Sequence, residues 1–361
     1  MRTYKKKLNG ILIIIILLLG IVIHFSSPII SKNNHSTIDV TNMNMLGSNV
    51  LGNNNLKGEK ANELTEINKN LVKDDFNGAY LGIVGKKLTF SNGFGYSYLG
   101  TKNAFRMDSA FFIGQYQNIL NTWMLLRVMS MKNIEPTSRL KNFLNVKYMD
   151  NSITLEDLLL GNAKYYISND TLNSITNKNL QSIVENNVVP VRSESKYTDA
   201  SNLIEMFLIA KLENETYATA TNKLLFNKIS AINSRVAQNG TIRINDVRSY
   251  VRYRKAYKEI QNSSLYDSGL HIKMSIFDLW QSANFIFKSD DTSTNRYQKV
   301  LQKVYRRKGI LQNNAGKIQF STSFGGQRII MNIHEKKTLI VVTNTNRGSI
   351  QDLSKRLIQL Y

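Results

Sequence analysis

The sequence contains 361 residues, of which 42% are apolar and 20% charged, with a formal charge of +21 and no cysteine. This composition is ordinary for a globular protein and allows a substantial core. The lack of cysteine excludes disulfide bonds, thiolate metal sites, a cysteine nucleophile and lipid attachment at cysteine. The positive charge is spread along the whole chain, so it indicates either a solvated lysine-rich surface or an anionic partner.

The first 30 residues have the pattern of an export signal. Residues 1–7 contain four basic side chains, and Gly10–Ile23 is a continuous apolar run of 14 residues. A basic flank before a short apolar core is typical of a signal peptide. Because no small-x-small cleavage site follows, an uncleaved signal anchor is an equally good interpretation. In both cases we expect residues 8–30 to contact a membrane and the bulk of the chain to lie outside the cytoplasm.

Residues 31–75 predict a polar linker before a folded domain at 76–361. Ser31–Lys60 is rich in asparagine and lacks apolar periodicity, which is typical of a disordered stalk. Ala61–Leu71 has the pattern of a helix.

The folded domain begins and ends with strand patterns and is mainly helical between them. Apolar runs bounded by turn residues predict strands at Ala79–Val84, Leu88–Ser91, Lys317–Ser323, Gln327–Ile333 and Thr338–Thr343. Helical periodicity predicts helices at Ile153–Leu160, Ala200–Glu213, Ile276–Phe287 and Gly348–Tyr361. This order predicts an α+β protein: a five-stranded antiparallel sheet flanked by helices, with an α-helical lobe inserted over about residues 111–308. We expect the functional cleft between the lobe and the sheet.

The segment Phe111–Val128 predicts a central helix that is buried on every side. Its polar residues Gln115, Gln117, Asn118 and Asn121 stand at the start, and apolar side chains cover all sides after them. A helix N-terminus carries unpaired N–H groups and the positive end of the dipole, so we expect anion or oxyanion chemistry there. Neither Gln115 nor Asn118 can act as a nucleophile or a base at neutral pH.

Five local patterns occur in a familiar order. They are a hairpin with a Gly-x-Gly continuation, a Phe-x-Ile-Gly approach to the central helix, an Ile-Thr-x-x-x-Leu-Leu helix, a Gly-x-x-x-x-x-Ser-x-x-Asp-Leu segment and a Gly-Gly-Gln strand start, at 79–100, 111–114, 153–160, 268–280 and 324–344. In this order the chain resembles the β-lactamase-related serine hydrolases and penicillin-binding proteins, particularly their class C-like branch, over about Gly78–Tyr361. The resemblance implies a β-lactamase/transpeptidase-like fold.

The resemblance also implies where the catalytic motifs should lie, and the reactive residues are missing there. The family's Ser-x-x-Lys pair falls on Gln115 and Asn118. Its Tyr-x-Asn motif falls on Tyr197-Thr198-Asp199, and its Lys-Thr-Gly edge strand falls on Ser321-Thr322-Ser323. Because glutamine cannot be activated as serine is, we expect a hydrolase fold without serine hydrolysis.

Other interpretations of these residues stay open. A shifted register would make Ser109 the nucleophile, but Phe112 would then replace the lysine. Asp199 either lies in the cleft or caps the helix that follows it. Tyr197 is either a proton shuttle or a packed tyrosine. The residues that we expect to bind a ligand in the former substrate pocket are Gln115, Asn118, Tyr197, Asp199, Ser323 and Gly325.

Three hypotheses follow for the function. The first is a membrane-anchored, inactive homologue in the cell envelope that binds a peptide, a wall fragment or a protein partner. The second is an active hydrolase that uses Ser109 and Tyr197, and the third is a basic binder of an anionic envelope polymer. Arg243–Lys258 interleaves basic residues with tyrosine, but an exported protein meets little nucleic acid, so we expect none as partner. The four histidines lack ligand spacing, and we expect no metal and no cofactor.

Overall fold

A computed structural model describes residues 52–146, 149–190, 197–237, 242–253, 256–260, 270–288, 297–308, 310–312, 317–346 and 348–361. The predicted membrane segment at residues 8–30 lies outside these ranges, as does most of the predicted stalk. Within the ranges, no helix combines the length and the apolar character that crossing a bilayer requires.

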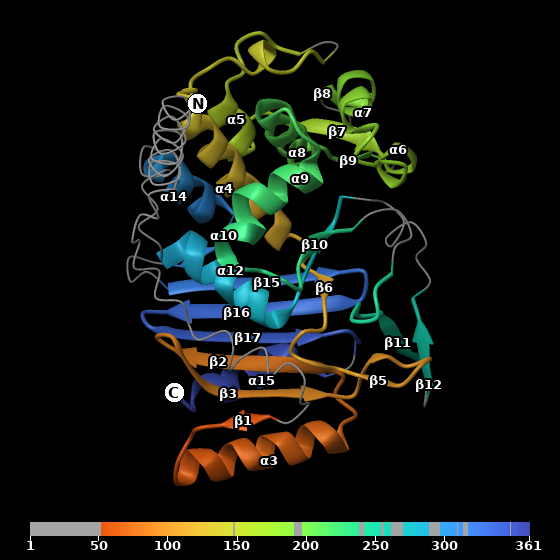
Figure 1. Cartoon of the computed structure of the whole chain (residues 1–361), viewed down its shortest axis with the longest axis vertical. Helices are drawn as coiled ribbons and strands as arrows, with labels where there is room; N and C mark the ends of the chain where they lie inside the picture. The colour runs from red at the N-terminus through yellow and green to blue at the C-terminus, as the bar shows by residue number, and fades with distance from the viewer. Residues whose placement is uncertain are drawn as a thin grey trace, which may run out of the picture. The chain divides into compact units, whose positions relative to one another are not determined.

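The domain is organised on an antiparallel sheet whose five long strands lie in the order β3-β2-β17-β16-β15 (Figure 1). They are β2 (Gly78–Val84), β3 (Lys87–Phe94), β15 (Lys317–Phe324), β16 (Gln327–His334) and β17 (Lys337–Thr343), and the two-residue strands β1 (Asn53–Asn54) and β14 (Leu311–Gln312) extend the two edges. The predicted five-stranded sheet is confirmed. Its two halves join where β2 pairs with β17, from Gly78 opposite Thr343 to Val84 opposite Lys337.

The sequence of each strand matches its place in the sheet. The central strands β2 and β17 are nearly continuous apolar runs and are buried on both faces. Strand β15 alternates between buried and exposed residues, as expected for a strand with one covered face. Gly82 in β2 leaves room for the ring of Phe90, whose nearest atom would lie 2.4 Å from an added Cβ.

Helices cover both faces of the sheet. A cluster of buried apolar side chains joins residues of the strands with α3 (Glu59–Lys73) and α15 (Ile350–Ile358). Helix α12 (Ile276–Lys288) contacts β2 and β17. Helix α3 lies inside the segment 31–75 whose composition predicts a linker, and its Leu64 and Ile67 are fully buried in this cluster. The folded domain therefore begins earlier than residue 76.

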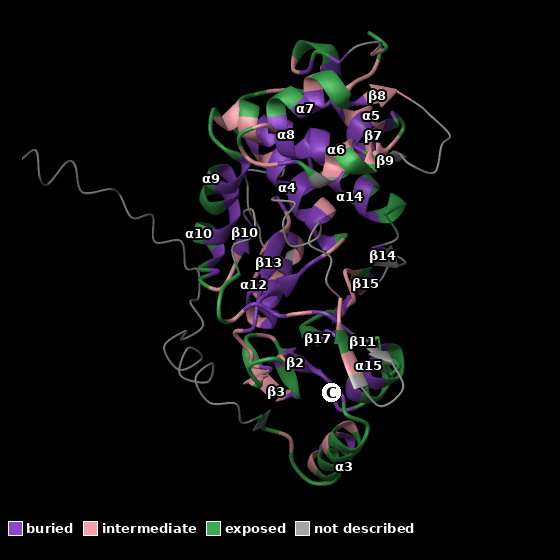
Figure 2. Cartoon of the chain, turned by 90° about the vertical axis from the view of Figure 1, so that its right-hand side faces the viewer, coloured by how far each residue is buried: buried purple, intermediate pink, exposed green. Residues whose placement is uncertain are grey.

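The inserted lobe is built around the predicted central helix, α4 (Tyr116–Met131). Figure 2 shows α4 and α8 (Ser201–Glu213) buried along most of their length, whereas α3 exposes much of its surface. Helix α4 packs against α8 and α14, so the prediction of burial on every side is confirmed. The other lobe helices are η1 (Leu140–Asn142), α5 (Leu155–Leu160), α6 (Asn169–Asn173), α7 (Leu180–Asn187), α9 (Tyr217–Thr221), the π-turn η2 (Asn222–Phe226), α10 (Asn227–Ile229) and α14 (Gln298–Arg307).

Small sheets accompany these helices and refine the expectation of a mainly helical insertion. They are β10-β13-β6, β8-β7-β9, β11-β12 and, before the lobe, β4-β5. Their strands are β4 (Tyr96–Tyr98), β5 (Asn103–Ala104), β6 (Phe111–Phe112), β7 (Tyr165–Ser168), β8 (Val189–Pro190), β9 (Tyr197–Asp199), β10 (Arg235–Val236), β11 (Tyr250–Tyr253), β12 (Ala256–Glu259) and β13 (Ile272–Met274).

One side chain connects the sheet to the segment that leads into α4. The Oε1 atom of Gln327, at the start of β16, accepts the N–H of Phe112 at 2.7 Å. Its Nε2 atom donates to the carbonyl of Val247 and to Oγ of Ser249, both at 3.1 Å. The Gly-Gly-Gln sequence therefore supplies a buried connector that fixes β6, and with it the start of α4, against the sheet.

Candidate functional site

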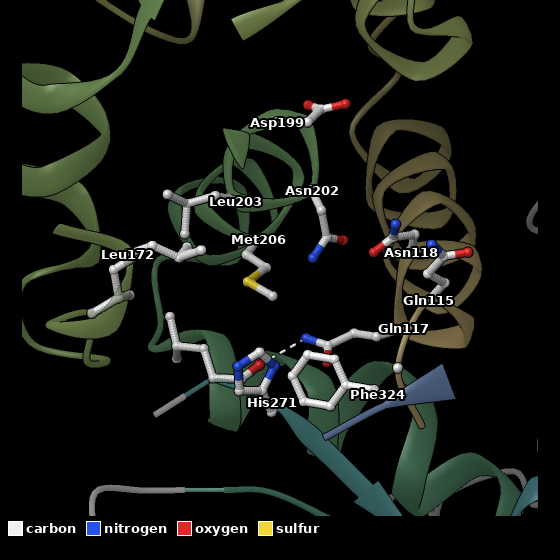
Figure 3. Close-up of a pocket in the computed structure, with 13 residues that line it drawn as sticks. Gln115, Gln117, Asn118, Leu172, Asp199, Asn202, Leu203, Met206, His271 and Phe324 are labelled. Carbon is white, nitrogen blue, oxygen red and sulfur yellow. Dashed lines mark hydrogen bonds between the residues drawn. The ribbon is translucent and has the colours of Figure 1, made fainter. Parts of the chain in front are cut away.

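A pocket of about 220 Å³ lies at the polar start of α4, between α4 and α8 and above the segment that enters β13 (Figure 3). It is lined by four amide side chains (Gln115, Gln117, Asn118, Asn202), the carboxylate of Asp199, the imidazole of His271, Gly114, and the apolar residues Leu172, Ile175, Leu203, Met206, Leu270 and Phe324. Among these described lining residues, no side chain carries a hydroxyl, a thiol or an amine. The pocket therefore offers amide and apolar surface rather than an activated nucleophile.

The N–H groups at the start of α4 are already paired. Gly114 has a φ of +53°, and an added Cβ would lie 2.8 Å from Oγ1 of Thr322. This close approach lets the N–H of Gln115 donate to Thr322 Oγ1 at 3.1 Å. The next three N–H groups donate to the carbonyl three residues earlier, at 3.0–3.1 Å. The expectation of unpaired donors for an anion or an oxyanion is therefore wrong, because β15 and the entry turn satisfy them.

A buried glutamine ties the first turn of α4 to the floor of the pocket. The Oε1 atom of Gln117 accepts the N–H of Ile272 at 2.9 Å. Its Nε2 atom donates to the carbonyl of Leu270 at 2.7 Å, the bond that is dashed in Figure 3. Both partners are main-chain groups of the segment entering β13. Since a main-chain N–H can only donate and a carbonyl can only accept, the orientation of this amide is fixed.

The same glutamine begins a row of polar contacts that ends at the pocket wall. Its Nε2 atom lies 3.4 Å from the hydroxyl of Tyr217, which donates to Oδ1 of Asn121 at 2.6 Å. The Nδ2 atom of Asn121 then donates to Oδ1 of Asn202, on α8, at 2.7 Å. We call Gln117, Tyr217, Asn121 and Asn202 the polar chain. It contains no charged group, although its first three members are fully buried.

A carboxylate lies between α4 and α8, next to the polar chain. Glu205 is 2% exposed, and its Oε2 atom accepts from Oγ1 of Thr122 at 2.9 Å. Burial raises the pKa of Glu205, whereas the Lys308 ammonium and the Thr122 hydroxyl act to lower it. The Lys308 ammonium donates to Thr122 Oγ1 at 3.1 Å. This group supports the helix that carries Asn118 rather than lining the pocket itself.

The floor of the pocket carries a neutral imidazole, and charged residues lie close to it along the chain. Burial and the charge of Lys273 lower the pKa of His271 to about 4, so its imidazole is neutral at pH 7. Two residues along the strand, the Lys273 ammonium lies 2.8 Å from Oδ2 of Asp246. The guanidinium of Arg235 contacts the other oxygen of Asp246. We call Arg235, Asp246 and Lys273 the ionic cluster.

Solved structures share this architecture. The chain is similar to FmtA from Staphylococcus aureus, with a TM-score of 0.58, 14% identity and coverage of 90% of this chain and 96% of that one. It is similar to a penicillin binding protein from Bacillus halodurans (TM-score 0.64, 11% identity, 82% and 100% coverage). It is also similar to D-amino acid amidase from Ochrobactrum anthropi SV3 complexed with D-phenylalanine (0.60, 12%, 84% and 99%). The chain has the β-lactamase-like serine hydrolase fold. No protein-family model and no curated protein sequence matches it.

Within this β-lactamase-like fold, three of the predicted site residues meet at one pocket. Gln115 immediately precedes α4, Asn118 lies in its first turn, and Asp199 ends β9. The Oδ1 atom of Asp199 also accepts the N–H of Ser201 at 2.7 Å, which fits the alternative of a helix-start residue. Tyr197 stands on β9 opposite Ser168 of β7, and its side chain lies outside the described part of the chain.

The other predicted residues lie around the pocket rather than in its lining. Ser109 is 2% exposed, in the turn before β6, and its Oγ atom accepts the N–H of Arg106 at 2.9 Å. Thr322 is buried against the start of α4, whereas Ser323 is exposed on β15. Gly325 stands in the turn between β15 and β16 with a φ of +55°. Ser109 as a nucleophile and Ser323 and Gly325 as ligand contacts stay predictions.

Sequence reasoning missed most of the lining, including Asn202, Met206, His271 and Phe324. One signal was present: Asn202 and Glu205 interrupt an otherwise apolar helix, and Gln117 and Asn121 do the same four residues apart on α4. Polar residues facing each other from two buried helices indicate a buried network. No group of three or more potential metal ligands occurs among the residues that the structure describes.

Proposed function

We propose that this protein is a catalytically inactive homologue of the β-lactamase-like serine hydrolases that binds a small ligand reversibly in the α4 pocket. The observation that carries the proposal is the composition of the lining. The pocket stands at the start of the buried helix, yet its described side chains are amides, one carboxylate, one neutral imidazole and apolar groups.

Acyl transfer needs a nucleophile, a base beside it and donors for the oxyanion. Gln115 and Asn118 stand where the resemblance implies the nucleophile and its lysine. The N–H of Gln115 donates to Thr322, so it is not available to stabilise an oxyanion. What remains is a concave apolar surface with a few oriented polar groups, which is the usual composition of a ligand pocket.

The test is covalent labelling of the full-length chain with a fluorescent penicillin and with a fluorophosphonate, followed by intact-mass spectrometry. We expect no adduct with either reagent. A single adduct that disappears in Ser109→Ala would overturn the proposal and establish the active hydrolase instead. Labelling that Ser109→Ala leaves intact but that a change at another serine abolishes would overturn it as well.

The proposal includes a location in the cell envelope with residues 8–30 as membrane anchor. It is supported by the basic flank and the apolar run at the N-terminus. We expect the full-length chain in the membrane fraction, and a chain that lacks residues 1–30 should not sediment there. Equal sedimentation of both chains would contradict the anchor.

The charge supports a second candidate, the binding of an anionic envelope polymer. Helix α14 exposes Lys299, Lys303, Arg306 and Arg307, of which Lys303 lies 2.9 Å from the carboxylate of Glu156. Binding through such contacts should weaken steeply with ionic strength. We expect Lys299→Glu with Arg306→Glu to reduce retention on a polyphosphate column at low salt. Retention that is insensitive to salt would rule this candidate out.

A further inference from the structure

We propose that the polar chain fixes the amide of Asn202 as a hydrogen-bond donor to the pocket, and that the pocket thereby selects a neutral ligand with a carbonyl-type oxygen and an apolar group. This inference rests on the proposed function, because it names the class of ligand for the same pocket. It follows from the direction of each hydrogen bond along the chain.

The direction is set at the main chain. The N–H of Ile272 must donate, so the atom of Gln117 that faces it is the oxygen. The carbonyl of Leu270 must accept, so the atom that faces it is the nitrogen. Two independent main-chain groups thus assign this buried amide, and its opposite orientation would place two donors and two acceptors against each other.

The orientation of the Gln117 amide determines the orientation of the next two residues of the polar chain. Since Nε2 of Gln117 can only donate, the hydroxyl of Tyr217 accepts from it at 3.4 Å and has its own hydrogen left to give. That hydrogen goes to Asn121, so the atom of Asn121 at 2.6 Å is its oxygen. The nitrogen of Asn121 is therefore the atom that faces Asn202, and it donates to Oδ1 at 2.7 Å.

Asn202, the last amide of the polar chain, lines the pocket. With its oxygen engaged by Asn121, Asn202 has its NH2 group left to offer. Figure 3 shows this nitrogen directed to the interior of the pocket, beside Met206. Among the described residues, the side chain of Asn202 makes one hydrogen bond, the one to Asn121. A ligand oxygen that accepts from this NH2 group would complete the network.

The rest of the lining selects against charge. Leu172, Ile175, Leu203 and Met206 form an apolar wall, and no lysine or arginine is among the described lining residues to neutralise an anion. Asp199 is the acidic residue of the lining, but its Oδ1 atom accepts the N–H of Ser201, and Figure 3 shows its carboxylate directed away from Asn202 and Met206. The imidazole of His271 is neutral. An ammonium ligand would meet the NH2 group of Asn202 donor against donor, and a carboxylate would be desolvated without a cation. A neutral amide or ester satisfies both conditions.

Three probes with the same branched tail separate these cases: 4-methylpentanamide, 4-methylpentanoate and 4-methylpentan-1-amine. Each is titrated into the full-length chain, and binding is followed by the NMR shift of the Met206 methyl group, assigned with Met206→Leu. We expect the amide to bind about tenfold or more tightly than either ion, the factor that one unpaired buried group costs.

Two variants test the direction of the hydrogen bonds in the polar chain. In Asn202→Asp, one carboxylate oxygen still accepts from Asn121 and the other faces the pocket, so the preference should invert to the amine by about tenfold. Tyr217→Phe removes the hydroxyl that orients Asn121, so the preference for the amide over the amine should narrow. Asn62→Asp, exposed on α3, introduces the same charge away from the pocket and should change nothing. Circular dichroism verifies that each variant is folded.

The outcomes separate this inference from the proposed function. If no probe shifts the Met206 methyl group, the pocket does not bind small molecules of this kind and the proposed function fails. If all three probes bind equally and Asn202→Asp leaves their order unchanged, the pocket binds ligands but the inference about Asn202 is wrong. If the amide is preferred and the preference inverts in Asn202→Asp, both stand.

Discussion

Two buried polar groups support the pocket, and they are built differently. The polar chain on the α4–α8 side holds four uncharged side chains, each oriented by its neighbour. The ionic cluster, with Lys273 on β13 and Arg235 opposite it on β10, holds one carboxylate between two cations, and Asp246 is only 2% exposed. An uncharged row can lose a member at moderate cost, whereas removing the carboxylate of the ionic cluster leaves two buried cations without their shared anion. The polar chain should therefore tolerate substitution better than the ionic cluster does.

We expect the greatest loss of stability when the carboxylate of the ionic cluster is removed. Asp246→Ala leaves Lys273 and Arg235 buried without their anion, and we expect it to destabilise the fold by about 3–5 kcal/mol. Urea unfolding measures this cost. The control is Asp352→Ala, whose exposed pair with Lys355 spans 4.0 Å and should cost less than about 1 kcal/mol. Equal effects of the two changes would contradict the ranking.

A substitution at the first residue of the polar chain should cost somewhat less stability. Gln117→Leu keeps the volume but leaves the N–H of Ile272 and the carbonyl of Leu270 without partners. We expect a loss of about 2–4 kcal/mol in the free energy of unfolding. Gln181→Leu, exposed on α7, is the matched control and should stay within about 0.5 kcal/mol. A loss larger than that of Asp246→Ala would reverse the comparison.

Asp278 is a third case, a buried carboxylate whose partners are uncharged, and it should make the stability depend on pH. Asp278 accepts from the Ser234 hydroxyl at 2.8 Å and the N–H of Asn233 at 3.1 Å. Burial raises the pKa of Asp278 to about 6. Because the folded pKa exceeds the unfolded one, its contribution to stability is fully present below about pH 4 and is lost as the pH rises through 6.

Asp278→Asn removes this titration. Relative to the variant, the wild type should lose about 2 kcal/mol of unfolding free energy between pH 4 and pH 7. Comparison with the variant is needed because His271 acts in the opposite direction. Its lowered pKa of about 4 contributes stability above pH 6.5 that is lost as the pH falls through 4. A wild-type–variant difference that is flat with pH would refute the account of Asp278.

The sheet and the central helix were predictable because their signals are local. The apolar runs of β2 and β17 and the all-round apolar surface of α4 can be recognised within a dozen residues. The same holds for the polar start of α4, which places Gln115 and Asn118 at the pocket. The motif order added the relation between these pieces, and the fold confirms it.

The chemistry of the site was less predictable because its contacts join distant segments. The N–H of Gln115 donates to a hydroxyl 207 positions away, and Gln117 bonds to groups more than 150 positions away. No periodicity in either segment encodes these partners. Thr322 was noticed as a degenerate motif residue, yet its role of closing the helix start could be seen only once β15 lay beside α4.

The pairing of β2 with β17 has a consequence for biosynthesis. Asn77 and Thr343 form a hydrogen bond across 266 positions of chain. A ribosome therefore releases the first hairpin long before its partner strand exists. Until then the apolar edge of β2 is exposed to other nascent chains, a state that favours aggregation. Efficient production of this protein should therefore depend on a chaperone that covers the edge of β2 until β17 has been synthesised.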